Sequence, residues 1–505
     1  MLKSNLPHPS TSLPPSSLLA AGAGLFLIEL LFWRRCFEAG FLQDDFIFLY
    51  RWGRASWGDV ASAWSIPPEG NWRPLSVATI FRVLWPLLGL RPWLFHLFNL
   101  CLFYLNSLLV WRLVTLLAGD VRSGFIAALL WSTHSCHSLT LYWIWAVGSL
   151  LGDVSYLAAL LCWFAAWPPG KDKAPSPNKK LLALMGALGF FMLGLASREN
   201  VALWPAAAFV ALLVLARARP AEKVLAGILL GALGALVWFV LIKPASPLRS
   251  EVYGFQFGWN VVRNLLAYGA YLLHFNREFG RALLEEGRLD AGVMLPLLTL
   301  ATLLAVFYFA QKGGNFASLF RRHFPAILWL VVFALIQLGP FLLLRWNNYA
   351  YYVSLVIIAP AAVLGLMLSE LLGRGGRERA VAVASLLVLV GVSWTSQRAE
   401  QARPLSILQR SLQVQAELEA SAPLLAGKKQ VTLVVRGISD RRWFDFGGGR
   451  AFPLFYPQEV RRAVNLSHLA QEPLDADDTP LVLDYTEEGF KLYKGPALDL
   501  PRRER

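Results

Sequence analysis

Charge is scarce in this chain of 505 residues: only 16% of them are Asp, Glu, Lys or Arg, while 56% are hydrophobic. Cysteine is scarcer still, and the four cysteines are scattered without the spacing of a metal site, which predicts no disulfide framework. No cleavable signal peptide is evident. Residues 1–16 are expected to be a polar cytoplasmic tail, rich in Pro and Ser, that precedes an uncleaved first membrane span.

Long apolar runs dominate the rest of the sequence and recur from residue 17 to residue 396. Because these runs lack the period-2 alternation of a β-barrel, they predict an all-α polytopic membrane protein. About eleven spans are expected, with a first extracytoplasmic loop at 36–92, a short interfacial helix at 76–90, and a small extracytoplasmic α/β domain at 397–505. The expected spans are 17–35, 93–117, 123–141, 147–167, 180–196, 201–216, 223–243, 291–310, 324–343, 353–372 and 380–396.

Positive charge follows the loops of this predicted topology. The net charge of +14 would favour a nucleic-acid partner in a soluble protein, but here many Lys and Arg residues lie in alternate short loops. Such loops are typically cytoplasmic, so membrane orientation explains the charge and no nucleic-acid partner is expected. The N-terminus is therefore predicted inside and the C-terminal domain outside.

Two adjacent carboxylates, Asp44 and Asp45, follow the first apolar run amid aromatic residues. Adjacent carboxylates repel each other, and a partly apolar setting makes it costly to charge both. A protein tolerates such a pair mostly where it needs a base or a cation site. A solvated loop start or a helix cap is the simpler alternative.

Further polar residues gather with this pair at the predicted outer face, where ionisable groups are costly and usually functional. They are Arg73, His134, His137, Arg198, Glu199, Arg345 and Tyr349. Each also has a structural alternative. Arg73 can snorkel, Arg198 and Glu199 can form a local ion pair, and Tyr349 can belong to an aromatic belt. The two histidines, three residues apart, would share one face of a helix, but without a third ligand they do not indicate a metal.

The order of these residues resembles that of the GT-C glycosyltransferases over roughly residues 20 to 360. It looks most like the animal transmembrane O-mannosyltransferases that modify cadherins, and is more distantly similar to protein O-mannosyltransferases and bacterial aminoarabinose transferases. The chain lacks the tetratricopeptide repeats of the cadherin-directed branch, and Arg198 stands where that branch would carry Lys. The resemblance rests on Asp44-Asp45, Arg73-Pro74-Leu75, His96 and Asn99, His134 and His137 with Gly148, Arg198-Glu199, and Arg345 with Tyr349 and Tyr351.

The resemblance implies an inverting enzyme of a bacterial inner membrane that transfers a sugar from a polyprenyl-phosphate donor to a hydroxyl of a glycan, lipid or protein acceptor. Asp44 would be the catalytic base and Asp45 would orient it or the acceptor. The implied donor phosphate ligands are Arg73, Arg198 and Arg345, and the implied substrate-binding residues are His134, His137, Glu199 and Tyr349. No cofactor is expected, and a divalent metal is not indicated.

Two other functions fit the same composition. A transporter or flippase also buries charge, but it should place polar residues near the bilayer midplane and often shows internal repeats. No repeat is evident here, and the polar residues cluster at one face. A lipid-linked glycan polymerase or ligase shares the topology but usually relies on Arg and His rather than an Asp pair in the first loop.

Overall fold

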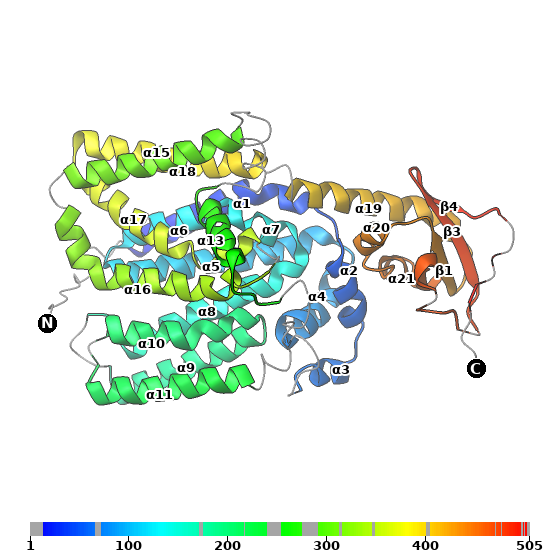
Figure 1. Cartoon of the computed structure of the whole chain (residues 1–505), viewed down its shortest axis with the longest axis horizontal. Coiled ribbons are helices and arrows are strands. Elements are labelled where there is room, and N and C mark those ends of the chain that lie inside the picture. The colour runs from blue at the N-terminus through cyan, green and yellow to red at the C-terminus, as the bar shows by residue number, and fades with distance from the viewer. Residues whose placement is uncertain are drawn as a thin grey trace.

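The computed structural model describes residues 14–65, 72–170, 175–216, 218–239, 254–274, 291–312, 316–345, 349–399, 404–469, 471–475, 477–495, 498 and 500–501. Long helices running side by side form most of the molecule, and a small sheet domain stands at one end of them (Figure 1). Their bounds are α1 Pro15–Trp33, α5 Pro92–Ala118, α6 Val121–Thr133, α8 Val147–Ala166, α9 Pro177–Leu195, α10 Trp204–Val214, α11 Pro220–Val237, α15 Ala291–Lys312, α16 Phe316–Leu342, α17 Ile358–Gly373 and α18 Gly376–Ala399.

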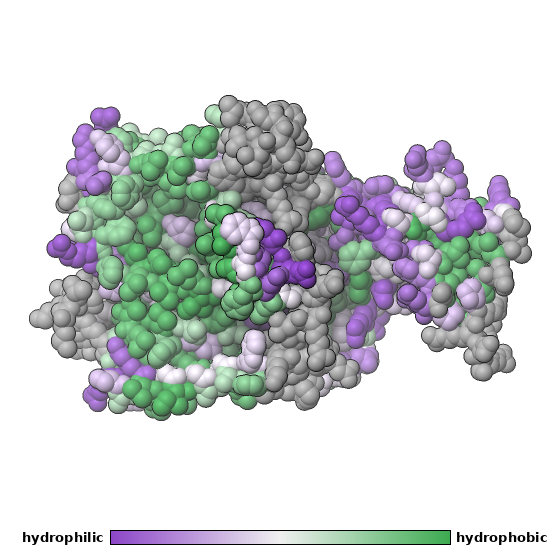
Figure 2. All heavy atoms as spheres, viewed as in Figure 1, coloured by the Kyte–Doolittle hydropathy of each residue, from purple (hydrophilic) through white to green (hydrophobic). Residues whose placement is uncertain are grey.

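Each of the eleven predicted spans overlaps a helix of the described chain, although residues 240–243 of the span predicted at 223–243 lie outside the described residues. Eight helices of the described chain are long and apolar enough to cross a membrane, whereas α6, α10 and α17 are shorter. On the face drawn in Figure 2, apolar residues make up most of the coloured surface of the helical part, whereas the sheet domain is largely polar. The protein is therefore a multi-pass membrane protein.

The predicted continuous span at 123–141 is wrong. α6 ends at Thr133, because His134 adopts an extended ψ of 135° and its Nδ1 accepts the N–H of Cys136 at 3.2 Å. A 3₁₀ turn over Ser135–His137 follows, and α7, Ser138–Tyr142, resumes the helix. His134 and His137 therefore do not share the face of one helix.

Short elements link α1 to α5 at the end of the bundle that carries the sheet domain (Figure 1). Their bounds are the 3₁₀ helix Arg34–Glu38, α2 Asp44–Phe48, the π-helix Leu49–Gly53, α3 Trp57–Ser62, the π-helix Pro74–Thr79 and α4 Ile80–Leu88. The last two form the helix predicted at 76–90. The remaining short elements are the 3₁₀ turns Ile144–Ala146, Glu199–Leu203 and Ala350–Val353, and α13 Trp259–Leu272.

The C-terminal domain is the predicted small α/β unit. α19, Pro404–Leu425, leads into a sheet of order β2-β1-β3-β4, in which β1 pairs parallel with β2 and β3 while β4 pairs antiparallel with β3. The continuous buried run of β1 suits a central parallel strand. The other bounds are β1 Val431–Arg436, α20 Asp440–Asp445, α21 Ala451–Phe455, β2 Val460–Asn465, the 3₁₀ turn Leu466–His468, β3 Pro480–Thr486 and β4 Gly489–Leu492.

One hydrophobic cluster joins this domain to the segment that carries the Asp pair. Phe41 and Phe46 are buried with Phe446 and Phe452 of the domain and with Val414 of α19. The domain is thus packed onto the helical part, and it lies at the same end as the predicted site.

Candidate active site

Asp44 is the first residue of α2 and lines a cavity of about 360 Å³. The residue before it, Gln43, has φ 54° and ψ −113°, a backbone conformation uncommon outside glycine. Burial raises the pKa of the Asp44 carboxyl to about 6, and the positive charge of Arg73 opposes this shift. Near neutral pH, Asp44 is therefore ionised but sits close to its titration range, as a general base requires.

Asp45 does not line this cavity. It is 1% exposed, and its two oxygens accept backbone N–H groups, from Leu42 at 3.0 Å and from Trp145 at 2.7 Å. Burial raises its pKa well above the usual range, although these two hydrogen bonds act in the opposite direction. Asp45 thus ties the start of α2 to Trp145, whose ring lies stacked on Phe48 and lines the cavity.

Arg73 and Glu199 form a forked ion pair at the cavity wall. Arg73 donates from Nε to Oε2 at 2.7 Å and from Nη2 to Oε1 at 2.5 Å. The backbone reinforces this contact, because Leu75 N–H donates to the carbonyl of Ala196 at 2.9 Å and Ser76 Oγ donates to that of Ser197 at 2.8 Å. The loop with Arg-Pro-Leu and the hairpin with Arg-Glu are therefore one unit, and most of the Arg73 charge is already neutralised.

Arg198 differs from Arg73 in its partners. It is 7% exposed, and its guanidinium carbon lies 5.2 Å from the ring centre of Tyr351 and 5.7 Å from that of Tyr352. Within the described residues no carboxylate forms an ion pair with it, although Asp153 is near enough to interact electrostatically. A buried cation in this state is suited to an anionic ligand.

The backbone of α8 passes very close to the hairpin that carries Arg198. A Cβ on Gly148 would lie 3.0 Å from Ser76 Oγ and 3.2 Å from the carbonyl oxygen of Ser197. A Cβ on Gly152 would lie 3.1 Å from Cβ of Arg198. These two glycines let the helix, the hairpin and the Arg73 loop meet, which brings both arginines to one cavity.

The cavity is lined by both charged and apolar residues. Asp44, Arg73, Arg198, Glu199 and Tyr349 all lie on it, so it unites five of the nine sequence-predicted residues. Its remaining lining is mostly aromatic or apolar: Trp143, Trp145, Ala146, Gly148, Ser149, Asn200, Ala202, Leu203, Gly234, Trp238, Phe255, Pro340, Phe341, Leu344, Tyr351 and Tyr352. A few charged groups within a mostly apolar lining suit an amphiphilic ligand.

The other predicted residues lie elsewhere. His134 stacks on His274 with ring centres 4.1 Å apart, and His137 packs 4.4 Å from the ring centre of Trp131. The Arg345 N–H donates to the carbonyl of Gly254 at 3.1 Å, which fixes the end of α16, and its side chain does not line the cavity. Both histidines are buried in the bundle and apart from the cavity.

Sequence reasoning missed Trp238 and Phe255 of the cavity wall. Both come from segments remote from the Asp pair, and nothing distinguishes them from the many other aromatic residues of a membrane protein. No group of three or more His, Cys, Asp or Glu side chains that could hold a metal occurs among the described residues.

The crystal structure of the Archaeoglobus fulgidus oligosaccharyltransferase, tethered with an acceptor peptide containing the NVT sequon, is similar to this structure. The TM-score is 0.50 and the sequence identity 12%, over 88% of this chain. The chain has a GT-C fold. It spans 64% of the length of that neighbour, and at this identity the likeness concerns the fold alone. No family model and no curated protein matches the chain.

Proposed function

We propose that this GT-C protein is an inverting glycosyltransferase that moves a sugar from a polyprenyl-phosphate donor to an acceptor hydroxyl. The observation that carries the proposal is one cavity that is lined by Asp44, by two arginines and by many apolar and aromatic side chains. The volume of about 360 Å³ falls in the range of small-molecule sites, about 300–1,000 Å³.

The donor phosphate is assigned to Arg198. Its guanidinium is buried without an ion-pair partner in the described chain, so a phosphate would gain a charge-assisted hydrogen bond without breaking an existing pair. Arg73 is the second candidate, but Glu199 already occupies its forked donors. The apolar lining with Trp238, Phe255 and Phe341 is suited to the first part of the lipid chain.

The number of free carboxylates in the cavity supports inversion. Among the described lining residues only Asp44 and Glu199 carry a carboxyl group, and Glu199 is held by Arg73. A single free carboxylate favours one direct displacement over a covalent intermediate. The acceptor oxygen forms a bond to the anomeric carbon while the bond from that carbon to the phosphate oxygen breaks. Asp44 takes the hydroxyl proton, and the electron pair leaves with the polyprenyl phosphate, stabilised by Arg198.

The polar residues of the site support a reaction at the end of the helical part that carries the C-terminal domain. With the N-terminus in the cytoplasm, as the basic loops predict, that end is extracytoplasmic, in a bacterial inner membrane. A lipid-linked donor is suited to this compartment because it remains anchored in the bilayer. The acceptor hydroxyl belongs to a glycan, a lipid or a protein.

The test is to incubate purified protein in lipid nanodiscs with a panel of polyprenyl-phosphate sugars and with glycan, lipid and peptide acceptors. Acceptor-dependent release of polyprenyl phosphate, with the sugar on the acceptor in the inverted configuration, is expected for one donor. Retention of the anomeric configuration would refute the single displacement. Movement of the intact donor between leaflets without its cleavage would favour a flippase instead.

A further inference from the structure

Gln43 has the most unusual backbone at the candidate site. It is one of three non-glycine residues in the described chain with positive φ, together with His274 and Gln430. It directly precedes Asp44 and begins the helix that carries this carboxylate. Because an unfavourable backbone conformation persists only where its surroundings enforce it, something must hold Gln43 in place.

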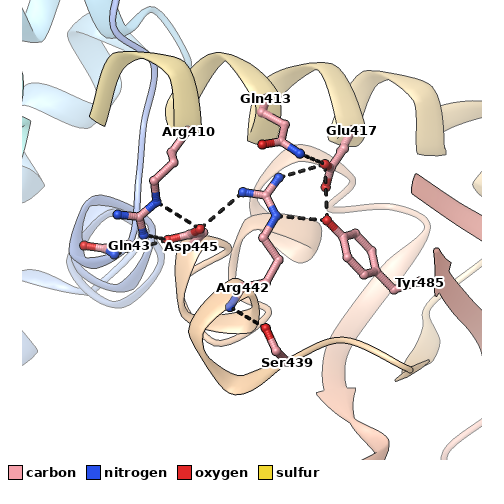
Figure 3. Close-up of polar contacts among 8 residues, drawn as sticks. All are labelled: Gln43, Arg410, Gln413, Glu417, Ser439, Arg442, Asp445 and Tyr485. Carbon is pink, nitrogen blue, oxygen red and sulfur yellow. Dashed lines mark hydrogen bonds and ion pairs between the residues drawn. The ribbon is translucent and has the colours of Figure 1, made fainter. Parts of the chain in front are cut away.

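Asp445 of the C-terminal domain makes two contacts with Gln43. The Gln43 N–H donates to the Asp445 carbonyl oxygen at 3.1 Å, and Nε2 donates to Asp445 Oδ1 at 3.2 Å (Figure 3). Asp445 is 3% exposed, although it comes from a domain about 400 residues further along the chain. A residue of the domain therefore fixes both the backbone and the side chain of the residue before Asp44.

Asp445 is itself held by two arginines. Arg410 of α19 donates to both of its oxygens, and Arg442 donates to Oδ2 at 3.2 Å (Figure 3). Arg442 also donates to Glu417 of α19 at 2.7 Å and to the hydroxyl of Tyr485 on β3 at 3.0 Å. The contact with Gln43 is thus anchored to the helix and the sheet of the whole domain.

Gly447 brings the domain unusually close to α2. A Cβ at this position would lie 2.6 Å from Cβ of Phe46 and 3.0 Å from the carbonyl oxygen of Gln43. That carbonyl accepts the N–H groups of Phe46 and Ile47 and so forms the first turn of α2. Only glycine fits here, because any side chain would push the domain away from the turn that presents Asp44.

We propose that the C-terminal domain is a positioning element for Asp44, in which Asp445 and Gly447 hold Gln43 so that the Asp44 carboxylate faces the cavity. This inference rests on the proposed function of Asp44 as the base. Asp445 and Gly447 line no part of the cavity and act through Gln43 and the first turn of α2. The domain is therefore a fixed part of the catalytic centre rather than an appended acceptor-binding module.

Two neighbouring glycines give a matched test. Gly447 and Gly448 have φ of 62° and 61°, so an alanine strains the backbone equally at both. At Gly448, however, the added Cβ would meet only the flexible end of Arg450, at 2.9 Å. Gly447→Ala should lower kcat about 10- to 100-fold with the donor KM unchanged, since small misplacement of a reacting group has effects of this size. Gly448→Ala should retain most of the activity, and equal kcat losses in the two variants would refute the proposal.

A second measurement is independent of the reaction. Hydrogen exchange of the backbone amides of residues 43–48 should quicken at least tenfold in Asp445→Asn. It should stay unchanged in Asp478→Asn, which alters a buried carboxylate of the same domain that pairs with Arg462. Unchanged exchange in Asp445→Asn would show that the domain does not hold this turn. Quickened exchange in a protein without transferase activity would refute the proposed function and leave the coupling of the domain to α2 intact.

Discussion

The pH dependence of sugar transfer should report the Asp44 carboxyl directly. Burial raises its pKa to about 6, so about nine-tenths of Asp44 is ionised at pH 7 and about one-tenth at pH 5. If the ionised form accepts the proton of the acceptor, kcat/KM should fall about tenfold between these pH values. The proposed donor is a phosphodiester, which stays ionised throughout this range and therefore adds no pH dependence of its own.

Asp44→Asn should remove both the activity and the acid limb. An amide keeps the shape of the side chain but cannot take the proton, and loss of a general base lowers the rate by about 10²–10⁴-fold. The residual activity should be independent of pH between 5 and 7. The assay is release of polyprenyl phosphate by protein in nanodiscs, with donor binding measured separately to show that the variant still binds.

The thermal stability of the Asp44→Asn variant supplies the control, because the substitution should raise stability near neutral pH while it lowers activity. A pKa raised in the folded state means that the protonated form favours folding below pH 4, and this contribution is lost as pH rises through about 6. Asp44→Asn should therefore match the wild type in Tm near pH 4 and exceed it at pH 7–8. A variant that is inactive yet more stable above pH 6 has lost chemistry rather than its fold.

Two results would refute this reasoning. The first is an Asp44→Asn variant that transfers sugar at a rate near that of the wild type. The second is an acid limb near pH 6 that persists in the variant, because another group would then titrate. In either case the Asp44 carboxylate would be a feature of the loop and not the base.

Three further predictions concern the phosphate site, the buried Asp45 and the membrane topology. Arg198→Ala should weaken donor binding about 10- to 100-fold. The double variant Arg73→Ala/Glu199→Ala should weaken it less, because it removes an ion pair that is already neutral. If donor titrations show the reverse order, the phosphate is bound by Arg73. Asp45→Asn should lower the free energy of unfolding by about 1–3 kcal/mol, since an amide cannot accept both buried N–H groups, and an unchanged Tm would contradict this. In a cysteine-free background, an impermeant thiol reagent should label Arg450→Cys but not Pro175→Cys in intact cells, and the opposite pattern would invert the topology.

Much of the fold follows from the sequence because a bilayer leaves few solutions. Apolar runs without water must satisfy their own backbone, so each predicted span was expected to be a helix, and each of the eleven overlaps one in the described chain, with the break at His134 as the exception. The α/β character of the tail could also be predicted, because β1 is a nearly continuous run of β-branched and apolar residues. The break at His134 could not be predicted, because no Pro or Gly marks it in the sequence. α6 ends there because the His134 side chain accepts the backbone N–H of Cys136.

The candidate site was also predictable from the sequence only in part. Adjacent carboxylates in an apolar setting, with arginines at the same predicted face, could be recognised from residue type and topology alone. Their separate roles could not, because Asp44 and Asp45 differ only in direction: one lines the cavity, and the other is enclosed by two backbone N–H groups. Likewise only the folded chain shows that Glu199 occupies Arg73 and leaves Arg198 available.

The sequence by itself determined a membrane bundle, a small α/β tail and a group of ionisable residues at one face, because hydrophobicity and charge act locally along the chain. The tertiary structure alone decided which of these residues share a cavity. It also decided that a carboxylate about 400 residues away holds the turn before Asp44. The physical reason is that hydrogen bonds and close packing depend on distances of a few ångströms between segments that no pattern in the sequence connects.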